Sequence, residues 1–219
     1  MTEVEMQELL KQATTLSHAE STQLVGLYNL IINGATGPSW AEAHNELASY
    51  YYGHAEYQQA ARHAQATLEG SESLVTTSAR ARAGIMACNA KDSLGQPVDI
   101  ELLRESTEGA IQTGQPYQGG VGASLLGHIV LSSGNRAAAR AAFERAVLLF
   151  DQSRSITGGP GMIRMLAIME IEDGRREAAR AWLEQGIRYL QQFPYAGKTA
   201  RFPEAKLKAL LASLDAPTP

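Results

Sequence analysis

The side chains best suited to metal binding or covalent catalysis lie scattered along this chain of 219 residues. The chain has five histidines and a single cysteine, Cys88. His44, His54 and His63 are nine or ten residues apart across a predicted turn, and no His-Glu-x-x-His motif occurs, so the sequence predicts no metal site. Neither a Gly-x-Ser-x-Gly nucleophile motif nor a second cysteine is present, so we expect no catalytic residue.

Two glycine-rich segments resemble phosphate-binding loops in composition. They read GGVGASLLG, from Gly119 to Gly127, and GGPG, from Gly158 to Gly161. No apolar strand precedes either segment, and neither ends in the Gly-Lys-Ser/Thr of a phosphate loop. We therefore interpret both as junctions at which the chain turns into a new helix, and we expect no nucleotide or other cofactor.

The charge of the chain argues against nucleic acid and anionic membrane as partners, because the formal net charge is −4. The later part is rich in arginine, but glutamates are interleaved with it, as in a solvated helix face with ion pairs. These arginines are Arg136, Arg140, Arg145, Arg175, Arg176, Arg180 and Arg188. A secondary contact of this face with another protein is an alternative hypothesis. The acidic cluster of Glu170, Glu172 and Asp173 is predicted to be solvated as well.

The N-terminal sequence MTEVEMQELLKQ is acidic and amphipathic, without the basic and then apolar regions of a signal peptide. No apolar run approaches the roughly 20 residues that span a bilayer. We therefore expect a soluble, cytoplasmic protein in a reducing compartment.

Helical periodicity is the strongest pattern in the chain. Residues Gly122–Phe150 read as two amphipathic helices separated by Ser-Ser-Gly-Asn, and weaker copies recur at a spacing of about 40 residues. The small residues Ala48, Gly127 and Ala167 occupy the same position in their copies and are 79 and 40 residues apart. The gap of 79 residues is about twice the period, so a further copy is predicted midway, with its small residue near Cys88. We therefore interpret this cysteine as a packing residue.

Turn signals place the boundaries of these helices. A helix is predicted from about Ser73 to Leu94, and Pro97 suits the first turn of the helix after it. Ser39 is placed to cap the helix that follows it. Linkers from Thr113 to Gly122 and from Asp151 to Gly161 would account for the length of the period.

The copies resemble the tetratricopeptide repeat, a helix-turn-helix unit with small and large residues at fixed offsets. The resemblance rests on Leu47-Ala48 and Tyr51 in an early copy, and on Leu126-Gly127 and Gly134-Asn135 in the best one. A third copy departs from the pattern, since Glu170 stands at its aromatic position. The resemblance implies an all-α superhelix, a solenoid of about five helix pairs with a C-terminal capping helix.

The whole chain reads as one such domain. Residues 1–198 are predicted to form the repeats, and residues 199–219 a capping helix with a frayed tail in the same domain. Leu207, Leu210, Leu211 and Leu214 would dock the capping helix.

Proteins with this repeat hold peptides or partner segments in a concave groove lined by the first helix of each pair, so the resemblance implies such a groove here. The positions that line the groove in the repeat family correspond here to the following candidate groove residues: Asn45, Ser49, Tyr52, Arg82, Asn89, Asp92, Ser124, His128, Leu131, Arg164 and Ile168. An extended peptide or a helix from another protein would suit this mixture of polar, aromatic and apolar side chains. The lysine and asparagine pairs with which chaperone-binding members grip a terminal carboxylate are not matched.

The leading hypothesis is a non-enzymatic scaffold or adaptor that mediates protein–protein interaction. A second is a regulatory module that senses a peptide or small molecule and acts through a separate effector protein. An enzyme or accessory subunit with an active site in the groove is the third. Homodimerisation through the N-terminal helices is a further hypothesis, because the stretch around Leu24, Val25 and Leu27 is more apolar than a free end needs.

Overall fold

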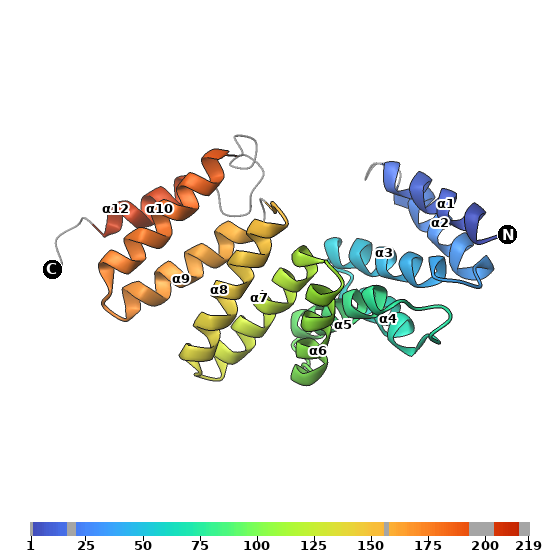
Figure 1. Cartoon of the computed structure of the whole chain (residues 1–219), viewed down its shortest axis with the longest axis horizontal. Coiled ribbons are helices and arrows are strands. Elements are labelled where there is room, and N and C mark those ends of the chain that lie inside the picture. Colours follow the sequence, from blue (N-terminus) through green and yellow to red (C-terminus); the bar gives the residue numbers. More distant parts are fainter. Residues whose placement is uncertain (1, 17–20, 156–157, 193–203, 215–219) are drawn as a thin grey trace. The chain divides into compact units, whose positions relative to one another are not determined.

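Helices account for all regular structure in the part of the chain that the structure describes, which is residues 2–16, 21–155, 158–192 and 204–214. The computed structural model has eleven helices there (Figure 1). They are α1 (Glu3–Thr15), α2 (Ser21–Gly34), α3 (Ser39–Gly53), α4 (Tyr57–Glu69), α5 (Thr77–Ser93), α6 (Ile100–Gln112), α7 (Pro116–Ser132), α8 (Arg136–Gln152), α9 (Gly159–Glu172), α10 (Arg176–Gln192) and α12 (Glu204–Ser213). Five consecutive helix pairs are followed by α12, so the predicted all-α repeat fold is confirmed.

The chain forms two compact units, Met1–Gly114 and Gln115–Pro219. The first unit holds α1 to α6, and the second holds α7 to α12. Within each unit, a first helix packs on the second helix of its own pair, and that second helix packs on the first helix of the next pair. The division into repeats over residues 1–198 and a cap over residues 199–219 stays a prediction.

Small residues set the register of the first unit. Ala48 on α3, Ala64 on α4 and Ala87 on α5 form one buried cluster in which no member is more than 2% exposed. Ala48 and Ala87 are the positions that the 40-residue spacing linked. Cys88 beside them is buried, and burial raises the pKa of its thiol to about 11, so the thiol stays protonated and acts as a packing group, as predicted.

The glycine-rich segment Gly119–Gly127 lies inside α7, which corrects two predictions. The segment is not a junction, and the linker predicted from Thr113 to Gly122 is limited to residues 113–115, because α7 begins at Pro116. Pro116 begins α7 in the first helical turn, where its missing N–H removes no hydrogen bond. The second segment does lie at a junction, since Gly158 directly precedes α9 and Gly159 begins it.

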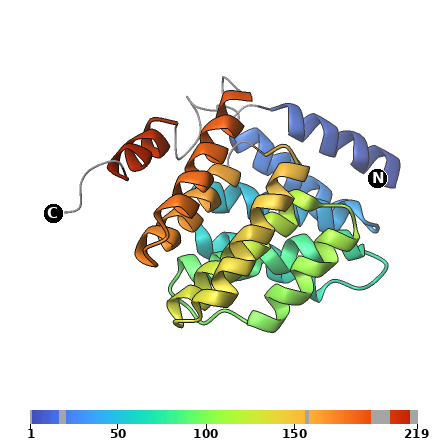
Figure 2. The same cartoon turned by 60° about the vertical axis from the view of Figure 1, so that its left-hand side comes forward.

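The glycines of α7 allow this helix to lie close against α8, and the two helices run side by side (Figures 1 and 2). A Cβ atom on Gly127 would stand 2.4 Å from the ring of Phe143, and one on Gly120 would stand 2.9 Å from the ring of Phe150. Both phenylalanines are buried on α8. The packing of α7 on α8 therefore requires glycine at position 127, although glycine is a poor helix former, because any side chain there would collide with Phe143.

The turn between α7 and α8 falls where the Ser-Ser-Gly-Asn break predicted it. Gly134 has a φ of +84°, a backbone conformation that glycine adopts without strain. The Asn135 side chain then accepts a hydrogen bond of 3.1 Å from the N–H of Ala138 and caps α8.

Two helix starts differ from the predictions because other side chains cap them, and one predicted cap is absent. The Thr76 side chain caps α5, so this helix begins at Thr77. Asp99 caps α6, which leaves Pro97 before the helix. Ser39 does not cap α3, because its hydroxyl donates a hydrogen bond of 2.5 Å to Glu3 of α1.

The acidic residues at the end of α9 pair with arginines from a neighbouring helix and from the following turn. Glu170 is 4% exposed and accepts hydrogen bonds from Arg140 of α8 and from Arg175. Arg136 of α8 contacts Asp173 at 2.9 Å. The predicted solvated cluster is therefore wrong for Glu170, because two guanidinium groups compensate the burial of its carboxylate at a position where the repeat usually has an aromatic ring.

The C-terminal helix α12 packs on α10, as expected of a cap. Leu207 is fully buried with Leu183 and Ile187 of α10, and Leu214 belongs to the same cluster. Leu210 and Leu211 pack against it. The predicted frayed tail, residues 215–219, lies outside the described residues.

Two glycine-to-alanine substitutions should change stability in opposite directions. Gly127→Ala should lower the free energy of unfolding, because overpacking against Phe143 costs about 1–3 kcal/mol and exceeds the gain in helix propensity. Gly26→Ala in α2 is the matched control, since nothing lies within 4 Å of its Cβ position. We expect Gly26→Ala to raise the free energy of unfolding by about 0.5–1 kcal/mol. Urea unfolding followed by circular dichroism measures both, and a stabilised Gly127→Ala protein would contradict the packing argument.

Candidate functional site

One face of the first unit combines side chains from the first helices α3 and α5. We call it the α3–α5 face, and it consists of Glu42, Glu46, Ser49, Tyr52, Arg82, Asn89 and Ser93. Residues three or four positions apart share one side of a helix, and the members of this set follow that spacing on α3. Contacts between α3 and α5 at both ends of the face align the two helices.

An ion-pair cluster forms one end of the α3–α5 face. The Arg82 guanidinium donates hydrogen bonds of 2.9 Å to Glu42 and 2.7 Å to Glu46. Burial raises the pKa of Glu42, while the charge of Arg82 acts in the opposite direction. Two carboxylates face a single guanidinium, so this end of the face carries an excess of negative charge.

An aromatic and hydroxyl group forms the other end. The Tyr52 hydroxyl and the Ser93 hydroxyl are 3.1 Å apart, and the Tyr52 ring lies 5.3 Å from the ring of Tyr57. Between the two ends, Ser49 is exposed and Asn89 is half-buried. Each of them donates a hydrogen bond to a carbonyl of its own helix, which keeps its side chain close to the helix surface.

Asn45 lies beneath the α3–α5 face instead of lining it. The side chain is 3% exposed, and its Nδ2 atom donates a hydrogen bond of 3.0 Å to the carbonyl of Ala79 on α5. Among the described residues its Oδ1 atom has no hydrogen-bond partner. Asn45 therefore fastens α3 to α5. Asp92, the last groove candidate of this unit, is exposed near the end of α5.

The remaining candidates belong to the second unit. Ser124, His128 and Leu131 lie on α7, and Arg164 and Ile168 lie on α9. His128 is exposed, and the centroid of its ring lies 5.0 Å from that of Phe143, with the two ring planes at 66°. Their part in a groove stays a prediction.

A pair of histidines lies between α3 and α4, although their separation in sequence gave no sign of it. Nδ1 of His44 is 3.0 Å from Nδ1 of His63, so one ring donates a hydrogen bond and the other accepts it. The Tyr51 ring stacks on the His63 ring with their centroids 5.4 Å apart, and the ring centroids of Trp40 and His44 are 4.3 Å apart. The two histidines lie on either side of the α3–α4 turn, on helices that pack against each other, and this placement is the signal that could have revealed the contact.

The histidine pair has too few ligands for a protein metal site of the usual kind. Within the described residues, no group of three or more histidine, cysteine, aspartate or glutamate side chains is arranged to hold a metal ion. Burial, and then the neighbouring His63, lower the pKa of His44 to about 4, and burial lowers the pKa of His63. Both rings are therefore neutral at pH 7.

This pair should make stability fall in mild acid. The unfolded histidines take up protons near their ordinary pKa of about 6.5, whereas the folded pair resists protonation. The contribution to stability is therefore complete above about pH 6.5 and is lost as the pH falls toward 4, by roughly 2 kcal/mol.

Thermal unfolding between pH 7.5 and 4 tests this expectation. A His44→Phe, His63→Phe double substitution should flatten the pH dependence of the melting temperature, whereas substitution of the exposed His54 by asparagine should leave it unchanged. Equal slopes for the double variant and the unaltered protein would show that the pair does not control acid stability.

Comparison with known proteins supports the fold and does not identify a function. No protein-family model matches the chain, and no curated protein matches it. The crystal structure of a thermophilic tetratricopeptide-repeat protein from Thermus thermophilus is similar, with a TM-score of 0.57 and 17% sequence identity. The match covers 95% of this chain and 98% of that one.

The helix pairs and this structural likeness define the class of the protein. It is a helical-repeat protein with a tetratricopeptide-like fold, as the sequence resemblance implied. None of the helices in the described ranges has the length and apolarity needed to cross a bilayer.

Proposed function

We propose that this protein is a non-enzymatic scaffold that binds a segment of another protein on the α3–α5 face. The observation that carries the proposal is the alignment of α3 and α5 by Arg82 at one end and by the Tyr52–Ser93 contact at the other. Repeat folds of this type stack helix pairs so that their first helices form an extended binding surface. A face held at both ends is preorganised, which reduces the ordering cost of binding.

The chemistry of the face favours a segment that carries a lysine or arginine beside an aromatic or aliphatic side chain. The excess carboxylate at Glu42 and Glu46 would attract the cationic group. The Tyr52 ring supplies a rigid contact surface with few degrees of freedom to lose. Because part of the attraction is electrostatic, affinity for such a segment should fall as the salt concentration rises.

Substitutions in the middle of the face test the proposal. A partner is first identified by its co-purification with the full chain from the native cell, and its affinity is then measured by calorimetry with both proteins purified. Ser49→Arg and Asn89→Arg should each weaken binding about tenfold or more, because a long cationic side chain would obstruct the face and oppose a basic segment.

Gln58→Arg on α4 is the matched control, since this exposed residue receives the same charge on a second helix outside the face. We expect it to leave the affinity unchanged. Unchanged affinity in both Ser49→Arg and Asn89→Arg proteins, with normal circular dichroism, would exclude the α3–α5 face as the binding surface.

A regulatory module that senses a peptide or small molecule is the second candidate function. It is favoured by one feature, a cavity in the second unit lined by α8, α9 and α10. Such a module would act through a separate effector protein. Homodimerisation through α1 and α2 also stays a prediction, and Val4 and Leu30 are the large apolar side chains exposed on those helices.

A further inference from the structure

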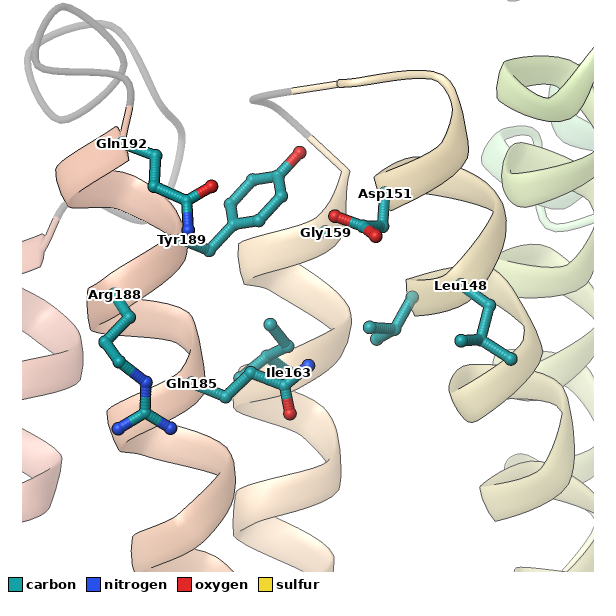
Figure 3. A pocket seen from close by; sticks show the side chains of 9 residues that line it. Leu148, Asp151, Gly159, Ile163, Gln185, Arg188, Tyr189 and Gln192 are labelled. Atoms are coloured by element: carbon teal, nitrogen blue, oxygen red, sulfur yellow. The ribbon is translucent and has the colours of Figure 1, made fainter.

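The cavity of the second unit has a volume of about 260 Å³ and lies between α8 and α10, with α9 at its base (Figure 3). Its apolar lining includes Ile163 of α9 together with Val147 and Leu148 of α8. Leu148 is 64% exposed, which is unusual for a leucine in this chain.

Gly159 at the start of α9 keeps the cavity open. A Cβ atom there would meet its nearest neighbours, atoms of Phe150 and Tyr189, only at 3.8 Å. This is an ordinary van der Waals distance, so close packing does not require a glycine at this position, in contrast to Gly127. The missing side chain leaves space beside the Tyr189 ring.

Opposite charges stand on opposite walls of the cavity. Asp151 lies on the α8 side and is turned toward Tyr189, while Arg188 lies along α10 (Figure 3). The Asp151 carboxylate forms no ion pair with any residue that the structure describes. Arg188 meets Glu184 only at 3.7 Å, and its side chain is 65% exposed, so this surface pair holds the guanidinium weakly.

The Tyr189 ring lines the cavity and is held in place by its hydroxyl group. Its hydroxyl donates a hydrogen bond of 2.5 Å to the carbonyl of Ser155, which anchors the ring at one end of the cavity. Burial and the nearby Asp151 raise the pKa of Tyr189, so the hydroxyl stays neutral and adds no charge. Asp151 is therefore the anionic group of the cavity, and Arg188 is the cationic one.

We propose that this cavity binds a small zwitterion, namely an α-amino acid or dipeptide with an aliphatic side chain. The ligand's ammonium group would contact Asp151, its carboxylate would contact Arg188, and its side chain would lie on Ile163 and Leu148. The volume limits the size of the ligand, because pockets for drug-sized molecules begin at about 300 Å³. This site uses helices other than α3 and α5 and does not depend on the scaffold function.

Calorimetry with four ligands tests the charge requirement on the full chain. L-leucine or L-leucyl-L-leucine should bind saturably, and the tighter of the two shows whether one or two residues fit. N-acetyl-L-leucine lacks the ammonium group and L-leucine methyl ester lacks the carboxylate, so each should bind at least about tenfold more weakly than L-leucine. Absence of saturable binding by both zwitterions, or equal binding of the blocked compounds, would overturn the proposal.

Substitutions locate the binding site in the same assay. Asp151→Asn and Arg188→Gln should each weaken binding about tenfold or more, because each preserves shape and removes one charge. Glu101→Gln and Arg104→Gln are the matched controls, since they remove the same charges from an exposed pair on α6. These controls should bind like the unaltered protein.

Gly159→Val provides a test that does not depend on charge. The new side chain should occupy the cavity and abolish binding, while helical circular dichroism stays normal because the Cβ atom itself is accommodated. Zwitterion binding that is unchanged in the Gly159→Val protein, or in both the Asp151→Asn and Arg188→Gln proteins, would place the ligand elsewhere and reject this site.

Discussion

The close approach of neighbouring helices is the constraint on which the rest of this structure depends. Two helices come within packing distance only where one of them presents a small residue to the other. In the second unit this residue is Gly127, which receives the ring of Phe143. In the first unit three alanines, Ala48, Ala64 and Ala87, meet at the corresponding place. The spacing of these residues sets the register of the helices.

This register also determines which polar side chains meet. Because α3 and α5 pack together, Arg82 can pair with Glu42 and Glu46, which precede it by 40 and 36 residues. In the second unit, the packing of α8 on α9 brings Arg140 to the buried carboxylate of Glu170. These ion pairs join helices of successive helix pairs, so within each unit they stabilise the packing of one helix pair on the next. A partner that binds on α3 and α5 would meet a surface whose side chains are already held in place.

The candidate site could be predicted only in part. Ser49, Tyr52, Arg82 and Asn89 lie on the first helices α3 and α5, where position in the repeat predicted them, and their part in a groove stays a prediction. Position in the repeat gave no means to distinguish a residue that lines a face from one that lies beneath it, and Asn45 is buried against α5. A rotation of a helix by a few tens of degrees decides between these two outcomes, and the packing of neighbouring side chains sets that rotation.

The sequence by itself determined the helical class, the number of helix pairs, the small-residue register and the packing role of Cys88. These properties follow from local periodicity and from residue size. Both concern residues within one or two helical turns of each other, so they can be recognised directly in the sequence. Tertiary structure alone decided that Gly119–Gly127 is helical, that His44 contacts His63, and that Asp151 and Arg188 lie across one cavity. Those outcomes depend on contacts between residues on different helices, and such contacts exist only after the helices have packed.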